Sequence, residues 1–132
     1  MSTKRREGTA SVELVLVFTI SVFLLFAIIE CGMLVNAKIL VTTAAREGAR
    51  RAAVDGGASQ AAYSRIREIL ESGGLWNDST QAQVEPHTAS FGATVTVRVE
   101  HMYQVRSAPL AVVIGSRIPV SAVVVSRSER VR

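Results

Sequence analysis

Apolar positions near the N-terminal end of the chain form an almost unbroken run. From Leu14 to Ile29 no residue carries a formal charge, and apolar residues continue to Val35 with a short polar interruption that begins at Glu30. A transmembrane helix needs about 20 mainly apolar residues. The pattern therefore predicts a membrane span over about residues 14–35.

Helical periodicity continues beyond the predicted span. No proline occurs from Thr9 to Val54, and small and apolar residues recur at helical spacing between Ile39 and Ala52. We predict one helix over residues 9–54, with its first half in the membrane and a stop at Gly56-Gly57. At ~1.5 Å per residue such a helix is a rod of roughly 69 Å.

The remaining residues, 55–132, show the periods of a small α+β domain. A helix is predicted from the cap at Ser59 to Ser72, and alternating apolar and polar residues predict strands over 93–105 and 118–126. Residues 75–91 are interpreted as a loop that can include a short strand. The apolar connector around residues 108–114 fits a short helix over the sheet, or a contact with lipid or a neighbouring subunit. The predicted fold is α+β: a long helix, transmembrane in its first half, packed on a short helix and antiparallel strands.

The first residues carry a concentrated charge. Residues 1–8 hold three basic residues and one acidic residue, which is +2 of the net +4 of the 132-residue chain. Positive charge before an apolar span favours a cytoplasmic N-terminus. Glu13 lies at the N-terminal end of the predicted span. A carboxylate within a span costs roughly 2.5–3.5 kcal/mol at the helix centre and less near the interface. An acid in this place is therefore a candidate functional residue.

Three interpretations of this start remain open. The chain could be an uncleaved single-pass anchor, or a secreted protein whose signal is cut after Ala37. The third interpretation rests on Gly8, five residues before Glu13 and just after the basic patch. This arrangement resembles the processing site of type IV pilins, which implies cleavage between Gly8 and Thr9 by a prepilin peptidase. Residues 1–8 would then be a cytoplasmic leader.

Two further groups of residues are candidate contacts. Small residues four apart, Ala44, Gly48 and Ala52, allow another backbone to approach closely. We predict that they serve helix packing and complete the core of the small domain. Glu30 falls near the outer interface of the span, where it is a candidate polar contact within the membrane or between subunits.

Several motifs, in order, resemble the TadE-like family, pseudopilins of the bacterial tight-adherence (Flp pilus) system. They are Glu-Gly-Thr-Ala-Ser-Val-Glu-Leu from Glu7, Ile28-Ile29-Glu30-Cys31-Gly32, Asn36-Ala37 and Thr-Ala-Ala-Arg-Glu-Gly-Ala-Arg from Thr43. The resemblance implies a structural minor pilin of the inner membrane with an exported C-terminal domain, able to enter a pilus. Its implied partners are a prepilin peptidase, other pilins and the Tad assembly machinery, beside membrane lipid. The other open interpretation is an uncleaved, membrane-anchored interaction module of the cell envelope.

Enzymatic and nucleic-acid-binding functions are not expected. His87 and His101 lack metal-ligand spacing, no phosphate-binding glycine loop occurs, and no nucleophile and base stand out. We therefore expect no catalysis, no metal and no cofactor. Basic residues are not interleaved with aromatic residues, so no nucleic-acid surface is expected either. Cys31, the single cysteine, fits a small apolar position in a membrane helix, or a disulfide between chains.

Overall fold

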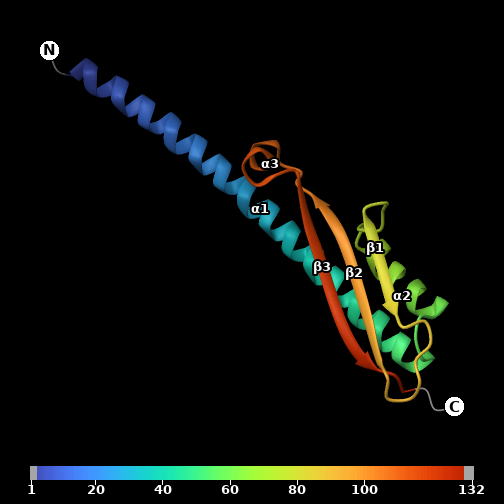
Figure 1. Cartoon of the computed structure of the whole chain (residues 1–132). Coiled ribbons are helices and arrows are strands. Elements are labelled where there is room, and N and C mark those ends of the chain that lie inside the picture. Colours follow the sequence, from blue (N-terminus) through green and yellow to red (C-terminus); the bar gives the residue numbers. More distant parts are fainter. Residues whose placement is uncertain (1–2, 130–132) are drawn as a thin grey trace.

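The computed structural model describes residues 3–129, and the side chains among them from Thr9 onward. The elements are α1 (Thr3–Asp55), α2 (Gln60–Ser72), β1 (Thr80–Glu85), β2 (Thr94–Gln104), α3 (Ala108–Ile114) and β3 (Arg117–Arg127). Figure 1 shows that the first half of α1 projects alone, while α2 and the sheet lie along its second half. The predicted α+β fold is confirmed. We call residues 9–29 the anchor segment and residues 56–129 the head.

Helix α1 ends where the sequence predicts, at Asp55, because two glycines follow in conformations that other residues rarely adopt. Gly56 has φ 78° and Gly57 has φ 126°. A Cβ atom on Gly57 would lie 2.5 Å from the carbonyl oxygen of His87, so the chain also needs the missing side chain there. At the other end, the helix begins within the predicted leader: residues 3–8 continue α1, whereas residues 1–2 lie outside the described residues.

The head contains a three-stranded antiparallel sheet in the order β1-β2-β3. Strand β2 pairs with β3 from Thr94↔Arg127 to Gln104↔Arg117, and with β1 from Thr80↔His101 to Glu85↔Thr96. Alternate side chains of β2 are buried, as the sequence pattern predicts for a strand with one buried face. Strand β1 occupies part of the segment read as loop.

The core lies between the buried face of the sheet, α2 and the second half of α1. Small side chains of α1 allow this close packing, since Ala44 and Ala52 are fully buried and Gly48 meets α2 directly. A Cβ atom on Gly48 would lie 2.4 Å from Cγ1 of Ile66, a distance that real Cβ contacts do not reach. The predicted small-residue positions thus face the head of the same chain.

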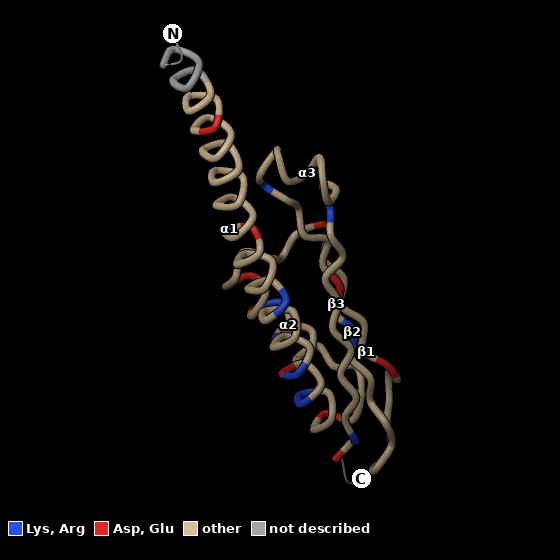
Figure 2. The backbone as a smooth tube through the Cα atoms, turned by 90° about the vertical axis from the view of Figure 1, so that its left-hand side faces the viewer, with Lys and Arg blue, Asp and Glu red and all other residues tan. Residues whose placement is uncertain are grey.

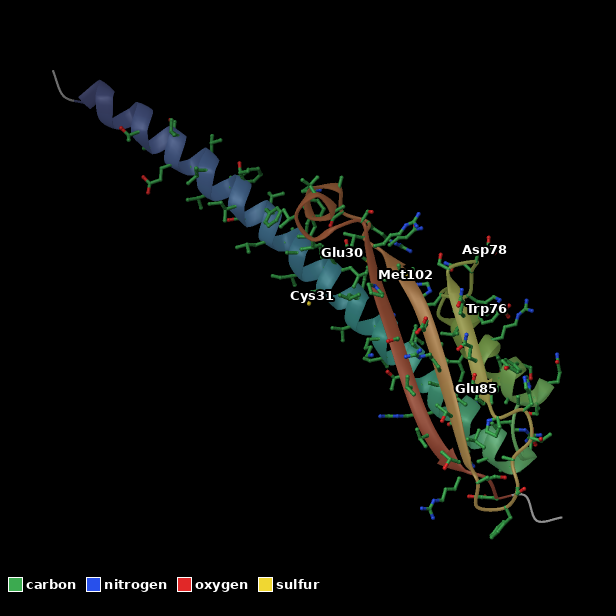
Figure 3. All side chains as sticks on the ribbon, viewed as in Figure 1. Glu30, Cys31, Trp76, Asp78, Glu85 and Met102 are labelled. Atoms are coloured by element: carbon green, nitrogen blue, oxygen red, sulfur yellow. The ribbon has the colours of Figure 1, made fainter. Side chains whose placement is uncertain are left out.

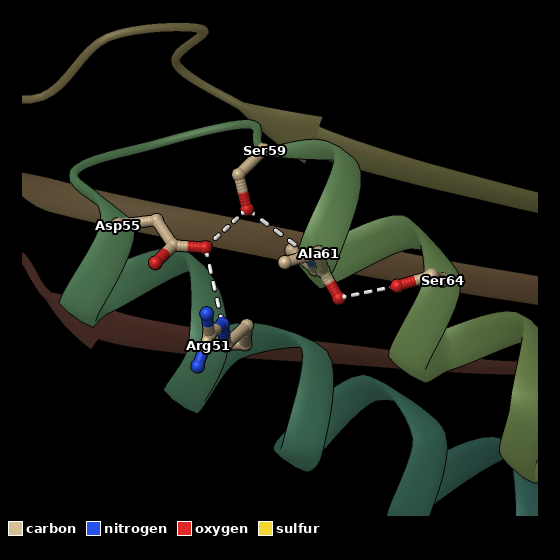
Figure 4. Close-up of polar contacts among 6 residues, drawn as sticks. Arg51, Asp55, Ser59, Ala61 and Ser64 are labelled. Atoms are coloured by element: carbon tan, nitrogen blue, oxygen red, sulfur yellow. Dashed lines mark hydrogen bonds and ion pairs between the residues drawn. The ribbon is translucent and has the colours of Figure 1, made fainter.

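Helix α2 begins with the predicted cap. The hydroxyl oxygen of Ser59 accepts a hydrogen bond from the backbone N–H of Ala62 at 3.0 Å and donates one to the Asp55 carboxylate at 2.6 Å. The same carboxylate oxygen pairs with Arg51 at 3.2 Å, so the end of α1 and the start of α2 share one polar cluster (Figure 4).

Helix α3 forms where the connector suggested a short helix, but it does not cover the sheet. Only Leu110 is buried, whereas Val112 and Val113 are 87% and 69% exposed. The element packs against α1, beside the end of the sheet that lies nearest the anchor segment (Figure 1). Hydrogen bonds from Arg106 and Ser107 to Glu30 hold the loop before α3 against α1.

Candidate functional site at the junction of anchor and head

Glu30 lies at the point where the exposed part of α1 meets the head, and its side chain is buried, with 3% of its surface exposed. Its carboxylate accepts four hydrogen bonds. Oε1 receives the Tyr103 hydroxyl at 2.8 Å and the Arg106 backbone N–H at 3.1 Å. Oε2 receives the Ser107 backbone N–H at 3.1 Å and its hydroxyl at 3.0 Å. A buried carboxylate is stable only with such partners.

The donors reach Glu30 because of where β2 ends. Tyr103 is the last inward-facing residue of β2, and Arg106 and Ser107 follow in the loop that leads into α3. Burial, together with the hydrogen bond to Glu30, raises the pKa of Tyr103 to about 12, so the phenol stays protonated and keeps donating. All four donors belong to the head, and the carboxylate therefore joins the head to the middle of α1 (Figure 3).

N-terminal to Glu30, the described side chains of the helix are exposed apart from Val22, Phe23 and Ala27, which are partly buried. The side chains of Leu14, Phe18 and Ile28 are between 66% and 70% exposed. Thr19 and Ser21 direct their hydroxyls to backbone carbonyls one turn earlier, at 2.8 and 2.7 Å, as expected for polar residues in an apolar span. The helix is long and apolar enough to cross a membrane, and none of its most apolar window is buried within the chain.

The boundary between these two parts of α1 limits where a bilayer can lie. From Glu30 onward one side of the helix is covered, and Ala37 is 1% exposed. Residues 9–29 would span ~32 Å as a helix, close to the ~30 Å of a bilayer's hydrocarbon core. The last residues of the predicted span, 30–35, therefore lie at the level where the head begins.

The structure does not bring the other predicted site residues to this junction. Thr9, which follows Gly8, and Glu13 lie in the projecting part of α1, and Glu13 is exposed. At 1.5 Å per residue, Glu13 is ~26 Å along the helix from Glu30. The three small packing residues lie further along, under α2 and the sheet. Figure 2 shows a long stretch without charge between the acidic position near the start of α1 and the next one along the helix.

His101 belongs to a separate polar contact within the sheet. Nδ1 of His101 lies 2.8 Å from the Thr80 hydroxyl, and burial lowers the pKa of His101, so the ring is a neutral partner within the sheet. Among the residues that the structure describes, no three His, Cys, Asp or Glu side chains gather as a possible ion site.

Sequence reasoning identified Glu30 but missed its partners. Tyr103 sits on the buried face of a predicted strand, and two of the four donors are backbone groups that no residue type marks. The sequence feature that could have indicated the contact is an acid at the end of the span together with a tyrosine at the end of a predicted strand. That pairing depends on a separation of 73 residues, which local periodicity does not report.

Comparison with known proteins gives a match to a protein family. A search of curated proteins and a search of solved structures each found no match. Residues 8–50 match the family described as TadE-like protein. The matched segment begins at Gly8, includes Glu13, Glu30 and Gly48, and ends before α2. The family indicated by the sequence motifs is thus confirmed over residues 8–50, and this TadE-like match implies a protein associated with a tight-adherence pilus.

Proposed function

We propose that the protein is a structural, non-enzymatic minor pilin or pseudopilin of a tight-adherence machine. The observation that supports this most directly is the overlap between the TadE-like match and the projecting half of α1. The basic residues before the anchor segment orient it with its N-terminus in the cytoplasm and the head exported from the inner membrane. Its partners are a prepilin peptidase, other pilins and the Tad assembly proteins.

Processing between Gly8 and Thr9 would place a new α-amino group at the start of the anchor segment. Glu13 would then be the fifth residue, one helical turn further on. Opposite charges within about 4–6 Å stabilise each other strongly where water is scarce. In an assembly, the Glu13 carboxylate neutralises the amino group of an adjacent subunit and sets the register between the two helices.

The shape of α1 suits a helix that exchanges lipid for neighbouring helices. Its anchor segment is exposed apart from Val22, Phe23 and Ala27, which are partly buried. Large exposed apolar side chains cover the rest, including Val12, Leu16, Ile20, Leu24 and Phe26. Such a surface is stable in hydrocarbon or against other apolar helices, but not in water. The anchor segment can therefore serve first as a membrane anchor and then as part of a polymer core.

The mass of the mature chain tests the processing step. The full chain is expressed with a prepilin peptidase, purified from membranes and measured intact. A chain that begins at Thr9 is expected. A chain that begins at Met1 would support the uncleaved anchor instead, and one that begins at Lys38 would support ordinary secretion.

Substitution of Glu13 tests the assembly step separately. We expect Glu13→Gln, which keeps the shape and removes the charge, to leave the mature mass unchanged but to reduce incorporation into pili. Thr19→Ala, a change within the same exposed segment that removes only a hydroxyl bonded to its own helix, is the matched control. Normal incorporation of Glu13→Gln would refute the role given to the carboxylate.

A further inference from the structure

The position of α3 is fixed relative to the anchor segment by Glu30. The carboxylate holds the backbone N–H groups of Arg106 and Ser107, and α3 begins at the next residue, Ala108. Figure 1 shows α3 at the end of the head nearest the projecting half of α1, with the long strands running away from it. Any bilayer that surrounds the anchor segment therefore ends close to α3.

The exposed surface of α3 is apolar. Val112, Val113 and Ile114 are 87%, 69% and 49% exposed, and they follow one another at the C-terminal end of the helix. Three consecutive apolar side chains in water are unfavourable, since burial is worth about 25 cal/mol per Å² of apolar surface. The helix that carries them lies at the end of the head nearest the anchor segment (Figure 1).

The charges around α3 are of one sign. Arg106 precedes the helix and Arg117 follows it, both are exposed, and no acidic residue occurs between Glu100 and Glu129. Among the described residues no carboxylate forms an ion pair with either arginine. Figure 2 shows basic positions on both sides of the α3 segment. Apolar residues with flanking arginines match the acyl chains and phosphates of an anionic lipid surface.

We propose that α3 is a second membrane contact of this protein. Val112, Val113 and Ile114 enter the leaflet on the head's side of the bilayer that α1 crosses, and the two arginines meet lipid phosphates. One helix alone leaves the head free to rotate about the helix axis. A second contact, held at the right depth by Glu30, fixes the face that the head presents above the membrane. This contact does not depend on cleavage after Gly8 or on polymerisation.

Quenching by brominated lipid tests the proposal in the full chain. The single tryptophan is replaced (Trp76→Phe), and a new one is introduced by Val113→Trp. One chain is placed in each nanodisc, and the nanodiscs consist of phosphatidylcholine and phosphatidylglycerol brominated on the acyl chains. Val123→Trp, at a 51% exposed position on β3, is the matched control. We expect Val113→Trp to be quenched several-fold more strongly than the control. Equal quenching at the two positions would overturn the proposal.

The alternative occupant of this surface is a second copy of the chain. In that case, Val113→Trp would be shielded from water only in nanodiscs that hold two chains, and lipid quenching would be absent in those that hold one. That result would also overturn the proposal. If Val113→Trp does not fold, a spin label attached to Val112→Cys in a Cys31→Ser background gives a second measurement. The label is expected to contact oxygen dissolved in lipid more than a water-soluble relaxant, and the reverse order would contradict the lipid contact.

The arginines have their own measurement. Replacing both (Arg106→Gln with Arg117→Gln) is expected to lower the quenching of Val113→Trp in discs with phosphatidylglycerol and to leave it nearly unchanged in pure phosphatidylcholine. Equal quenching with and without the arginines in the anionic discs would contradict the proposed contact between the arginines and lipid phosphates. None of these readouts depends on the mature N-terminus, so their failure would be distinct from failure of the proposed pilin function.

Discussion

The carboxylate of Glu30 changes the meaning of a charged residue beside an apolar span. In the sequence it is a candidate contact within the membrane or between subunits. In the structure its oxygens accept hydrogen bonds from two loop amides and two hydroxyls of the same chain. Removing the acceptor costs most at the buried Tyr103 hydroxyl, because a buried donor without a partner loses more free energy than the net contribution of its hydrogen bond.

Replacing Glu30 is therefore expected to loosen the head from α1. Glu30→Ala should lower the free energy of unfolding of the head by about 3 kcal/mol, the combined effect of one buried and three partly buried donors that lose their acceptor. Urea unfolding of the full chain in nanodiscs, followed by Trp76 fluorescence, measures this loss.

The matched control for Glu30 is Tyr103→Phe, which removes one donor and keeps the ring. Its expected cost is smaller, about 1 kcal/mol. A loss for Glu30→Ala no larger than that of Tyr103→Phe would show that the backbone donors do not depend on the carboxylate.

At the scale of elements, α1 has two different surroundings along one continuous helix. Gly32 has nothing within 4 Å of the place where a Cβ atom would lie, whereas Gly48 faces Ile66 of α2 at 2.4 Å. Glycine weakens a helix by about 1 kcal/mol relative to alanine, so a glycine at position 48 needs a packing reason. The close approach of α2 is that reason.

Replacement by alanine should affect stability differently at the two glycines. Gly48→Ala should destabilise the head, since overpacking costs about 1–3 kcal/mol and exceeds the gain in helix propensity. Gly32→Ala, the matched control, should be neutral or stabilising. Urea unfolding of each variant measures both effects. A second test combines Gly48→Ala with Ile66→Ala, where the penalty should shrink because the clashing atoms are gone. An unchanged penalty would contradict the proposed contact.

At the scale of the whole molecule, the protein is a rod with a head attached along one half of it. Among the described residues, the head buries side chains of α1 only from Glu30 onward. Residues 9–29, of which only Val22, Phe23 and Ala27 are partly buried, are left for the bilayer. The orientation proposed above then places Asn36, an exposed residue of α1, outside the cytoplasm, while Ser21 lies within hydrocarbon.

Thiol labelling tests this placement. In a Cys31→Ser background, a membrane-impermeant maleimide added from the outer side of the inner membrane should modify Asn36→Cys and not Ser21→Cys. Both positions are exposed in the isolated chain, so only the membrane distinguishes them. Labelling of Ser21→Cys at the same rate as Asn36→Cys would contradict the proposed span. Protection of Asn36→Cys until the membrane is permeabilised would show the opposite orientation.

The sequence by itself determined what depends on short-range rules. The apolar run and the absence of proline predicted α1, the glycine pair predicted its end, and Ser59 predicted the start of α2. The alternation of valines predicted β2 and β3 to within one residue at each end. Strand β1 was less evident because Val84 is its one fully buried residue, which leaves little alternation to detect.

Only the tertiary structure decided which distant groups meet. The backbone donors of Arg106 and Ser107 carry no residue-specific signal, so their contact with Glu30 appears only once β2 brings the loop to α1. The same contact places α3 beside α1 instead of over the sheet. Periodicity reports which face of an element is buried, but not which element covers it, because that depends on chain paths across many residues.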